Sequence, residues 1–270
     1  MRRILVSGGS TTFDALATSD AVSWPWQLEQ ALAAGRSGVE VWNAGMPTWT
    51  SLENVISLAV RDVDLEPDVA VLFQAINDLQ PASAAAFDPQ YEEHARMTRR
   101  ALGFDLEPLP WHRRLLLVEA VRGLLPVEAA PVHSPLPDPE PRRSERLPAE
   151  AVATFERNVR SFIALARGHG AEVLLVTQPI RLRTGRVDED AAYLEQSIPG
   201  PSGRSAAVEV ERLNAVLREV AREEDVALAD AAREIGWRDE DFGDPVHHTR
   251  AGAEKLVRFL APRIDALAAR

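Results

Sequence analysis

Short apolar runs recur along the chain, and each stops at a cluster of glycine and polar residues. The runs cover residues 4–6, 39–42, 69–73, 173–176 and 226–229. Between them lie segments with apolar residues at helical spacing, at about 21–34, 51–63, 148–167 and 206–224. Strands apolar on both faces that alternate with helices are typical of a parallel sheet covered on both sides. The sequence therefore predicts an α/β fold, a three-layer α/β/α doubly wound (flavodoxin-like) sheet of about five mostly parallel strands.

The alternation is interrupted between residues 85 and 147, which predicts an insertion within a single domain spanning 1–270. Proline-rich pieces there flank a possible helix at 111–125, with three interpretations: a packing helix, a lid over a pocket, or a membrane-surface helix. Residues 131–147 are expected to form a mobile loop. A polar loop is expected at 180–203, and helices near 231–235 and from 249 onward.

Composition excludes several classes of function. A net charge of −11 and a pI near 5.1 argue against nucleic acid or an anionic membrane as the partner. The absence of cysteine excludes disulfides, thiolate nucleophiles and cysteine-ligated metals. The histidines outside the C-terminal pair show no metal-ligand spacing, so no metal is expected. No apolar run has the length of a membrane span and no signal peptide fits the N-terminus, so a cytoplasmic protein is expected.

Polar residues follow the expected strands where ligands of open α/β sheets bind. Ser10, Gly45 and Asn77 come after the first three strands. Asp244 and His247 are three residues apart near the C-terminus, so the carboxylate can accept from imidazole Nδ1–H and leave Nε2 as a base. A hydroxyl, backbone and amide N–H donors and an Asp–His pair are the parts of an acyl-transfer site.

With these residues the chain resembles the SGNH hydrolases, also called the GDSL lipase/acylhydrolase family, named for Ser, Gly, Asn and His in separate sequence blocks. Residues 8–12 (Gly-Gly-Ser-Thr-Thr) match a variant first block, and 43–45, 75–78 and 244–247 resemble three later blocks. The resemblance implies a serine esterase that works through an acyl-enzyme without a cofactor. It also implies roles: Ser10 as nucleophile, His247 as base, Asp244 as its orienter, and an oxyanion hole from the backbone N–H groups of Ser10 and Gly45 with the Asn77 side chain.

Two positions depart from the family pattern. Ala75 stands where the third block usually has glycine, which is costly if the backbone there needs a positive φ. Asp14 stands where related stretches often carry glycine, and we expect it to add a charge at the rim of the site. By position, Thr11, Asp78 and Gln178 are possible pocket residues, although Asp78 is better explained as a residue that holds loops together.

Each candidate also has a structural interpretation. Ser10 fits a helix N-cap, Gly45 a turn glycine and Asn77 the cap of the third loop. His248, adjacent to the expected base, is expected to be structural or at the rim.

Four functions are compatible with these residues. The first is a carboxylic ester hydrolase acting on a small-molecule ester, such as an acylated sugar, a lipid or a small metabolite. The second is an acyltransferase that uses the same site. A flavodoxin-like phosphate-binding module is the third, but it lacks both nucleotide-binding glycine motifs and leaves Asp244 and His247 unexplained. A non-catalytic binding relative is the fourth. The oligomeric state is left open.

Overall fold

The computed structural model of the chain describes residues 1–34, 38–82, 87–92, 94, 146–197 and 202–269. The possible helix at 111–125 lies outside the described residues, as does most of the expected insertion and of the expected loop at 131–147.

Five parallel strands form one sheet in the order β2-β1-β3-β4-β5. They are β1 (Arg2–Gly8), β2 (Val39–Gly45), β3 (Val69–Phe73), β4 (Glu172–Val176) and β5 (Ala227–Ala229). This is the flavodoxin-like doubly wound order, in which ligands bind at the carboxyl edge of the sheet. The predicted fold class is confirmed.

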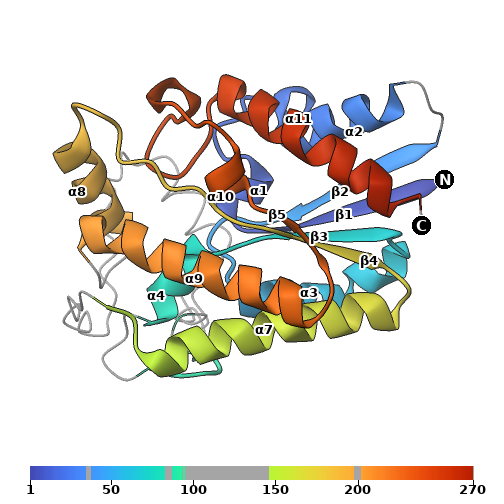
Figure 1. Cartoon of the computed structure of the whole chain (residues 1–270), viewed down its shortest axis with the longest axis horizontal. Coiled ribbons are helices and arrows are strands. Elements are labelled where there is room, and N and C mark those ends of the chain that lie inside the picture. The colour runs from blue at the N-terminus through green and yellow to red at the C-terminus, as the bar shows by residue number, and fades with distance from the viewer. Residues whose placement is uncertain (35–37, 83–86, 93, 95–145, 198–201, 270) are drawn as a thin grey trace, which may run out of the picture.

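Helices cover both faces of the sheet (Figure 1). On one face lie α2 (Trp24–Ala33) and α11 (Arg250–Leu267), and on the other lie α3 (Ser51–Val60), α7 (Ala149–Gly168) and α9 (Gly203–Glu223). The remaining helices in the described ranges are α1 (Ser10–Phe13), α4 (Leu79–Ala82), α8 (Val187–Ser197) and α10 (Ala231–Glu234). The 3₁₀ turns are η1 (Asp20–Val22), η2 (Asp62–Leu65), η3 (Ile76–Asp78) and η5 (Asp239–Asp241). None of the helices in the described ranges is long and apolar enough to cross a membrane.

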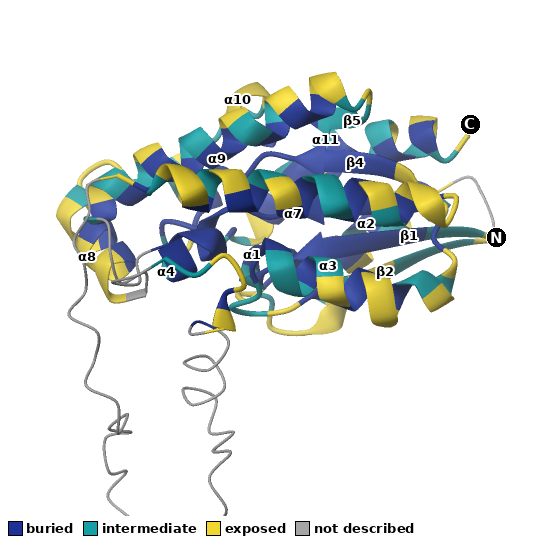
Figure 2. Cartoon of the chain, turned by 90° about the horizontal axis from the view of Figure 1, so that it is seen from below, coloured by how far each residue is buried: buried dark blue, intermediate teal, exposed yellow. Residues whose placement is uncertain are grey.

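The sheet divides the core into two layers because successive side chains of a strand point to opposite faces. In β3, Val71 and Phe73 pack with α2 and α11, whereas Ala70 and Leu72 pack with α3, α7 and α9. All five residues of β3 are buried, as its continuous apolar sequence predicts. Figure 2 shows the buried strands between helices whose outer faces are exposed. The sheet is thereby a rigid frame, and its carboxyl edge carries the polar loops.

The expectation of a loop at 180–203 is wrong for part of that segment, because α8 occupies residues 187–197. Three acidic residues (Asp188, Glu189, Asp190) lie in its first turn, where negative charge is favourable. Asp190 also accepts from the Arg183 N–H at 2.7 Å, which ties the preceding segment to the helix start. Ala191 and Leu194 are buried. Two apolar residues in a run of charges are too few to mark a helix in the sequence.

Candidate active site

A sharp turn from β1 into α1 presents Ser10. The two preceding glycines are required by close contacts: a Cβ on Gly8 would lie 2.2 Å from the Phe73 carbonyl oxygen, and one on Gly9 would lie 2.3 Å from Asn77 Nδ2. Ser10 is the first residue of α1, so its backbone N–H has no partner within the helix. Its half-buried side chain thus stands at the carboxyl edge of the sheet.

His247 lies against Ser10 although 237 residues separate them in the sequence. The His247 Nε2 atom is 2.8 Å from Ser10 Oγ, and the Nδ1 atom is 2.7 Å from Asp244 Oδ2. The other carboxylate oxygen, Oδ1, accepts from the backbone N–H groups of His247 and Val246, both at 2.8 Å. The Asp–His pair is therefore held from both sides, and the hydroxyl, imidazole and carboxylate form a continuous chain.

The Asp244 carboxylate is held in its charged form. Burial opposes ionisation, but hydrogen bonds from the His247 ring and from the backbone outweigh burial and hold the pKa of Asp244 below its ordinary value. The Tyr193 hydroxyl of α8 also donates to Asp244 Oδ2, at 3.2 Å. Sequence reasoning missed Tyr193 because it lies in the segment expected to be a loop.

The Asn77 amide lies beside the turn that carries Ser10. Asn77 is in η3, directly after β3, and its Nδ2 donates to the Trp49 carbonyl at 2.8 Å. The same nitrogen occupies the space that a Cβ on Gly9 would take. An amide nitrogen has two N–H groups, and the bond to Trp49 uses one of them.

Gly45 is placed differently from its expected role. Its N–H donates to Asn43 Oδ1 at 2.9 Å, so this donor is already engaged. A Cβ on Gly45 would lie 2.3 Å from the Phe13 nitrogen, which explains the glycine by close packing of β2 against α1. The assignment of the Gly45 N–H to an oxyanion hole stays a prediction, and in this structure the N–H points to Asn43.

The loop after β2 contains a strained residue that sequence reasoning missed. Met46 to Trp49 form a turn in which the Trp49 N–H donates to the Met46 carbonyl, and Thr48 has φ +71°. A β-branched residue rarely adopts this conformation, and such strain concentrates at functional sites. The Thr48 hydroxyl is also buried without a partner among the described residues. The available sequence signal was Pro47, because proline is common at the second position of turns whose third residue has a positive φ.

Ala75 has no such strain. Its φ of −160° is extended backbone that any residue adopts, so the departure from glycine is not costly here. Its side chain is fully buried in the core.

Thr11, Asp78 and Gln178 are all buried. Of these three predicted pocket residues, Gln178 lines a cavity beside α9, whereas Thr11 and Asp78 line neither of the two cavities described below. The Thr11 carbonyl accepts from Trp24 Nε1, and Gln178 accepts from the Ile76 N–H. Asp78 accepts from Ser51, Gln74 and Tyr91, so it holds loops together. Through these hydrogen bonds the three residues belong to the frame of the site.

Asp14 is also buried rather than at the rim, with 6% of its surface exposed. It caps α1 with φ +66°, and its carboxylate accepts from the Trp24 N–H at 2.8 Å. Burial raises the pKa of Asp14, and the Trp24 hydrogen bond and the charge of His247 only partly offset it.

His248 is a core residue. Its ring stacks on Trp237 with centroids 4.9 Å apart and lies close to Phe242 and Phe73. Burial, together with the neighbouring His247, lowers the pKa of His248 to about 4. The structural interpretation of this histidine therefore applies.

Two cavities lie near these loops. One of about 410 Å³ lies between α9, α10 and residues 178–181, and one of about 350 Å³ borders β2, Gly45 and Met46. Neither has Ser10 in its lining. In the part of the chain that the structure describes, no three histidine, aspartate or glutamate side chains are grouped to hold a metal.

A model of the GDSL-like Lipase/Acylhydrolase family matches residues 6–255. The chain belongs to this family. The match includes the turn of Ser10, the η3 turn and the Asp244–His247 loop. A search of curated proteins finds no match.

Several solved structures share the fold. A lipase/acylhydrolase from Enterococcus faecalis is 18% identical with a TM-score of 0.59, covering 98% of this chain and 96% of that one. TesA is 19% identical with a TM-score of 0.56, covering 98% and 99%. A variant of Axe2, an acetylxylan esterase from Geobacillus stearothermophilus, is 15% identical with a TM-score of 0.54, covering 97% and 94%. Family membership supports a hydrolase.

Proposed function

We propose that the protein is a carboxylic ester hydrolase that works through an acyl-enzyme on Ser10. One observation carries the proposal: His247 Nε2 lies 2.8 Å from Ser10 Oγ while its Nδ1 lies 2.7 Å from Asp244. A serine hydroxyl is a weak nucleophile until a hydrogen-bonded base accepts its proton, and this arrangement supplies that base.

In the first half of the reaction Ser10 Oγ attacks the ester carbonyl and its proton moves to His247 Nε2. The Asp244 carboxylate stabilises the imidazolium that forms. The tetrahedral intermediate collapses when His247 gives the proton to the leaving alcohol oxygen, and the acyl group remains on Ser10. In the second half His247 takes a proton from water, the hydroxide displaces Ser10 from the acyl group, and Ser10 is reprotonated.

Two donors are proposed for the oxyanion. The Ser10 N–H, at the start of α1, has no partner within that helix, and Asn77 Nδ2 has a second N–H beside Gly9. Donors placed before reaction stabilise the developing charge without reorganisation, which is the largest contribution in many acyl-transfer enzymes.

The proposed substrate is a small-molecule ester, such as an acylated sugar, a lipid or a small metabolite. Axe2 acts on acetylxylan, and we carry over only the type of bond cleaved.

Hydrolysis of p-nitrophenyl acetate and butyrate tests the proposal. Ser10→Ala and His247→Ala should each lower kcat by about 10⁴-fold or more, because the triad acts as a unit. The wild type, but not Ser10→Ala, should be labelled by a serine-directed organophosphonate.

Ser7→Ala is the matched control, because Ser7 is buried in β1 and its hydroxyl has no partner within the described ranges. It should keep wild-type kcat. A wild-type protein that neither turns over these esters nor takes the label contradicts the proposal.

Acyl transfer uses the same residues, so adding alcohol or sugar acceptors to the assay and following the products separates transfer from hydrolysis. We propose that residues 85–147 are an insertion in a single domain, and exclusion of water by it would favour transfer. A phosphate-binding module or a non-catalytic relative would not need the hydrogen bonds that join Ser10, His247 and Asp244.

A further inference from the structure

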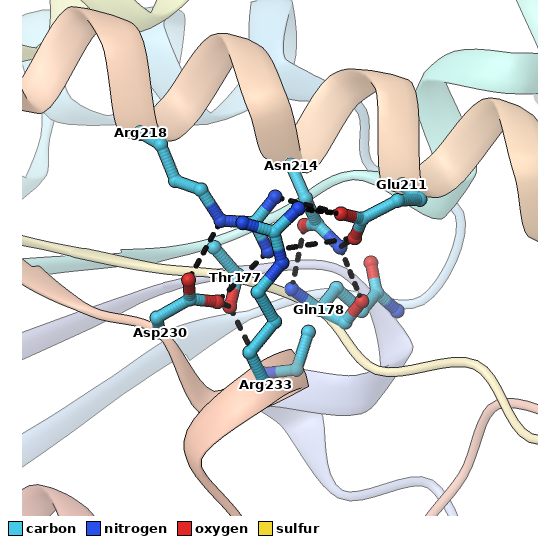
Figure 3. Close-up of polar contacts among 8 residues, drawn as sticks. Thr177, Gln178, Glu211, Asn214, Arg218, Asp230 and Arg233 are labelled. Atoms are coloured by element: carbon cyan, nitrogen blue, oxygen red, sulfur yellow. Dashed lines mark hydrogen bonds and ion pairs between the residues drawn. The ribbon is translucent and has the colours of Figure 1, made fainter.

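Gln178 is held rigidly in the loop that follows β4. Asn214 of α9 makes two hydrogen bonds with its backbone: the Gln178 N–H donates to Asn214 Oδ1 at 2.9 Å, and Asn214 Nδ2 donates to the Gln178 carbonyl at 2.8 Å (Figure 3). Both residues are 1% exposed. Helix α9 therefore sets the position of this residue.

The Gln178 side chain reaches a distant turn. Its Oε1 accepts from the Ile76 N–H at 2.8 Å, across 102 residues of sequence. Ile76 is the first residue of η3, and an N–H at the start of a helical turn has no partner within it. Asn77 is the next residue, so the bond fixes the peptide that precedes the proposed oxyanion donor.

Only the oxygen of the Gln178 side-chain amide is hydrogen-bonded. Gln178 Nε2 is buried and has no partner among the described residues. An unpaired buried donor is destabilising, so an apolar side chain would suit a residue that only fills space. Proteins commonly keep a destabilising side chain where that side chain serves function. We therefore attribute the glutamine at position 178 to the hydrogen bond that its Oε1 accepts from Ile76.

The position of the Asn77 amide has little tolerance. Nδ2 lies against Gly9 and donates to the Trp49 carbonyl, which leaves one N–H for the oxyanion. Displacements of about 1 Å at such a donor cost up to about 10²-fold in rate.

We propose that Gln178 is a positioning residue that holds the η3 turn, and through it the Asn77 amide, at the oxyanion site. Asn214 of α9 anchors Gln178. The loop after β4 and helix α9 thereby support the Asn77 amide, which the loop after β3 carries. This inference rests on the proposed role of Asn77.

The test compares Gln178→Met, which keeps the length of the side chain but loses the strong acceptor, with Gln178→Glu, which keeps an oxygen at the acceptor position. Both are made with and without Asn77→Ala, and kcat, KM and thermal stability are measured with p-nitrophenyl butyrate. Gln178→Met should lower kcat about 10-fold and leave KM within about twofold, because the interaction acts in the transition state. Gln178→Glu should recover most of kcat. In the Asn77→Ala background, Gln178→Met should change kcat by less than about twofold, since residues that act through one another are not additive.

Thr177→Val is the matched control in the same loop. The buried Thr177 hydroxyl donates to Asp230 and accepts from the Ala232 N–H, so its contacts go to the α10 side (Figure 3). It should lose stability comparably to Gln178→Met yet keep kcat within about twofold.

Wild-type kcat in Gln178→Met overturns the inference, as does an equal loss of kcat in the presence and absence of Asn77→Ala. If Thr177→Val loses kcat to the same extent, the effect is one of general stability and the inference also fails. Wild-type kcat in Asn77→Ala alone refutes the oxyanion role of Asn77 as well, which distinguishes failure of the proposed function from failure of this inference.

Discussion

The absence of a Cβ at Gly9 lets the Asn77 amide lie against the turn that carries Ser10, the proposed nucleophile. Gly9 has φ −90° and ψ −150°, which L-residues adopt, so the glycine is required by space rather than by backbone conformation. The atom that a Cβ would displace is Asn77 Nδ2.

Gly9→Ala should therefore fold and lose activity. The added Cβ pushes the Asn77 amide away, and kcat for p-nitrophenyl esters should fall about 10-fold or more. Gly168→Ala is the control, because a Cβ at Gly168 meets no atom within 4 Å at the end of α7. Equal kcat in the two variants would contradict the close contact between Gly9 and Asn77.

Among the single residues, Ser10, Asn77, Asp244 and His247 could be predicted because each lies in a short motif after a strand or in a single turn. The contact from Gln178 to Ile76 could not, since no local pattern reports a hydrogen bond across 102 residues. The engagement of the Gly45 N–H by Asn43 depends on a side-chain rotamer that sequence spacing does not specify.

Between elements, Asp78 joins three segments. It accepts from Ser51 at the start of α3, from Gln74 after β3 and from the Tyr91 hydroxyl. Ser51 in turn accepts from Asn158 of α7 at 2.9 Å. Burial raises the pKa of Asp78 from 3.8 to about 6, because these hydrogen bonds do not fully offset desolvation.

Asp78→Asn should change the pH dependence of stability. Between pH 3.8 and about 6 the native state holds a proton on Asp78 that the unfolded state has released, so the wild type loses stability as pH rises. Relative to Asp78→Asn, the wild-type free energy of unfolding should fall by about 3 kcal/mol from about pH 4 to pH 7. Denaturant titrations across this range measure the difference. Parallel curves for the two proteins would show that Asp78 does not titrate there.

Element prediction succeeded where burial leaves a mark on the sequence. The continuous apolar run of β3 has that mark because helices cover both of its faces. Helix α8 lacks it, since the only apolar side chains that it buries are Ala191 and Leu194, and its polar contacts go to residues distant in the sequence as well as to the preceding loop.

At the scale of the whole molecule, a second buried group, His248, makes stability depend on pH in the opposite direction to Asp78. His248 lies among Phe73, Trp237 and Phe242, between the sheet and the C-terminal loops. Burial lowers its pKa to about 4, whereas an unfolded histidine takes up a proton near pH 6.5.

His248→Phe should remove a loss of stability in acid. Between about pH 6.5 and pH 4 the unfolded state binds a proton that the native state does not, so the wild type loses stability as pH falls, by about 3 kcal/mol. The variant should lack this slope, whatever its stability at neutral pH. Thermal unfolding at several pH values measures it, and a wild-type slope in the variant would refute the assignment. The slopes of His248 and Asp78 have opposite sign, so each becomes visible when the other group is removed.

The distance of 237 residues between Ser10 and His247 has a consequence for how the protein is made. The proposed nucleophile Ser10 is synthesised early and the proposed base late, so we expect a nascent chain to carry an unreactive hydroxyl until the segment around His247 docks on the sheet edge. Activity then reports completed folding. A ribosome-bound chain stalled before residue 244 should bind no serine-directed organophosphonate, and a separately supplied C-terminal fragment that docks correctly would start the chemistry.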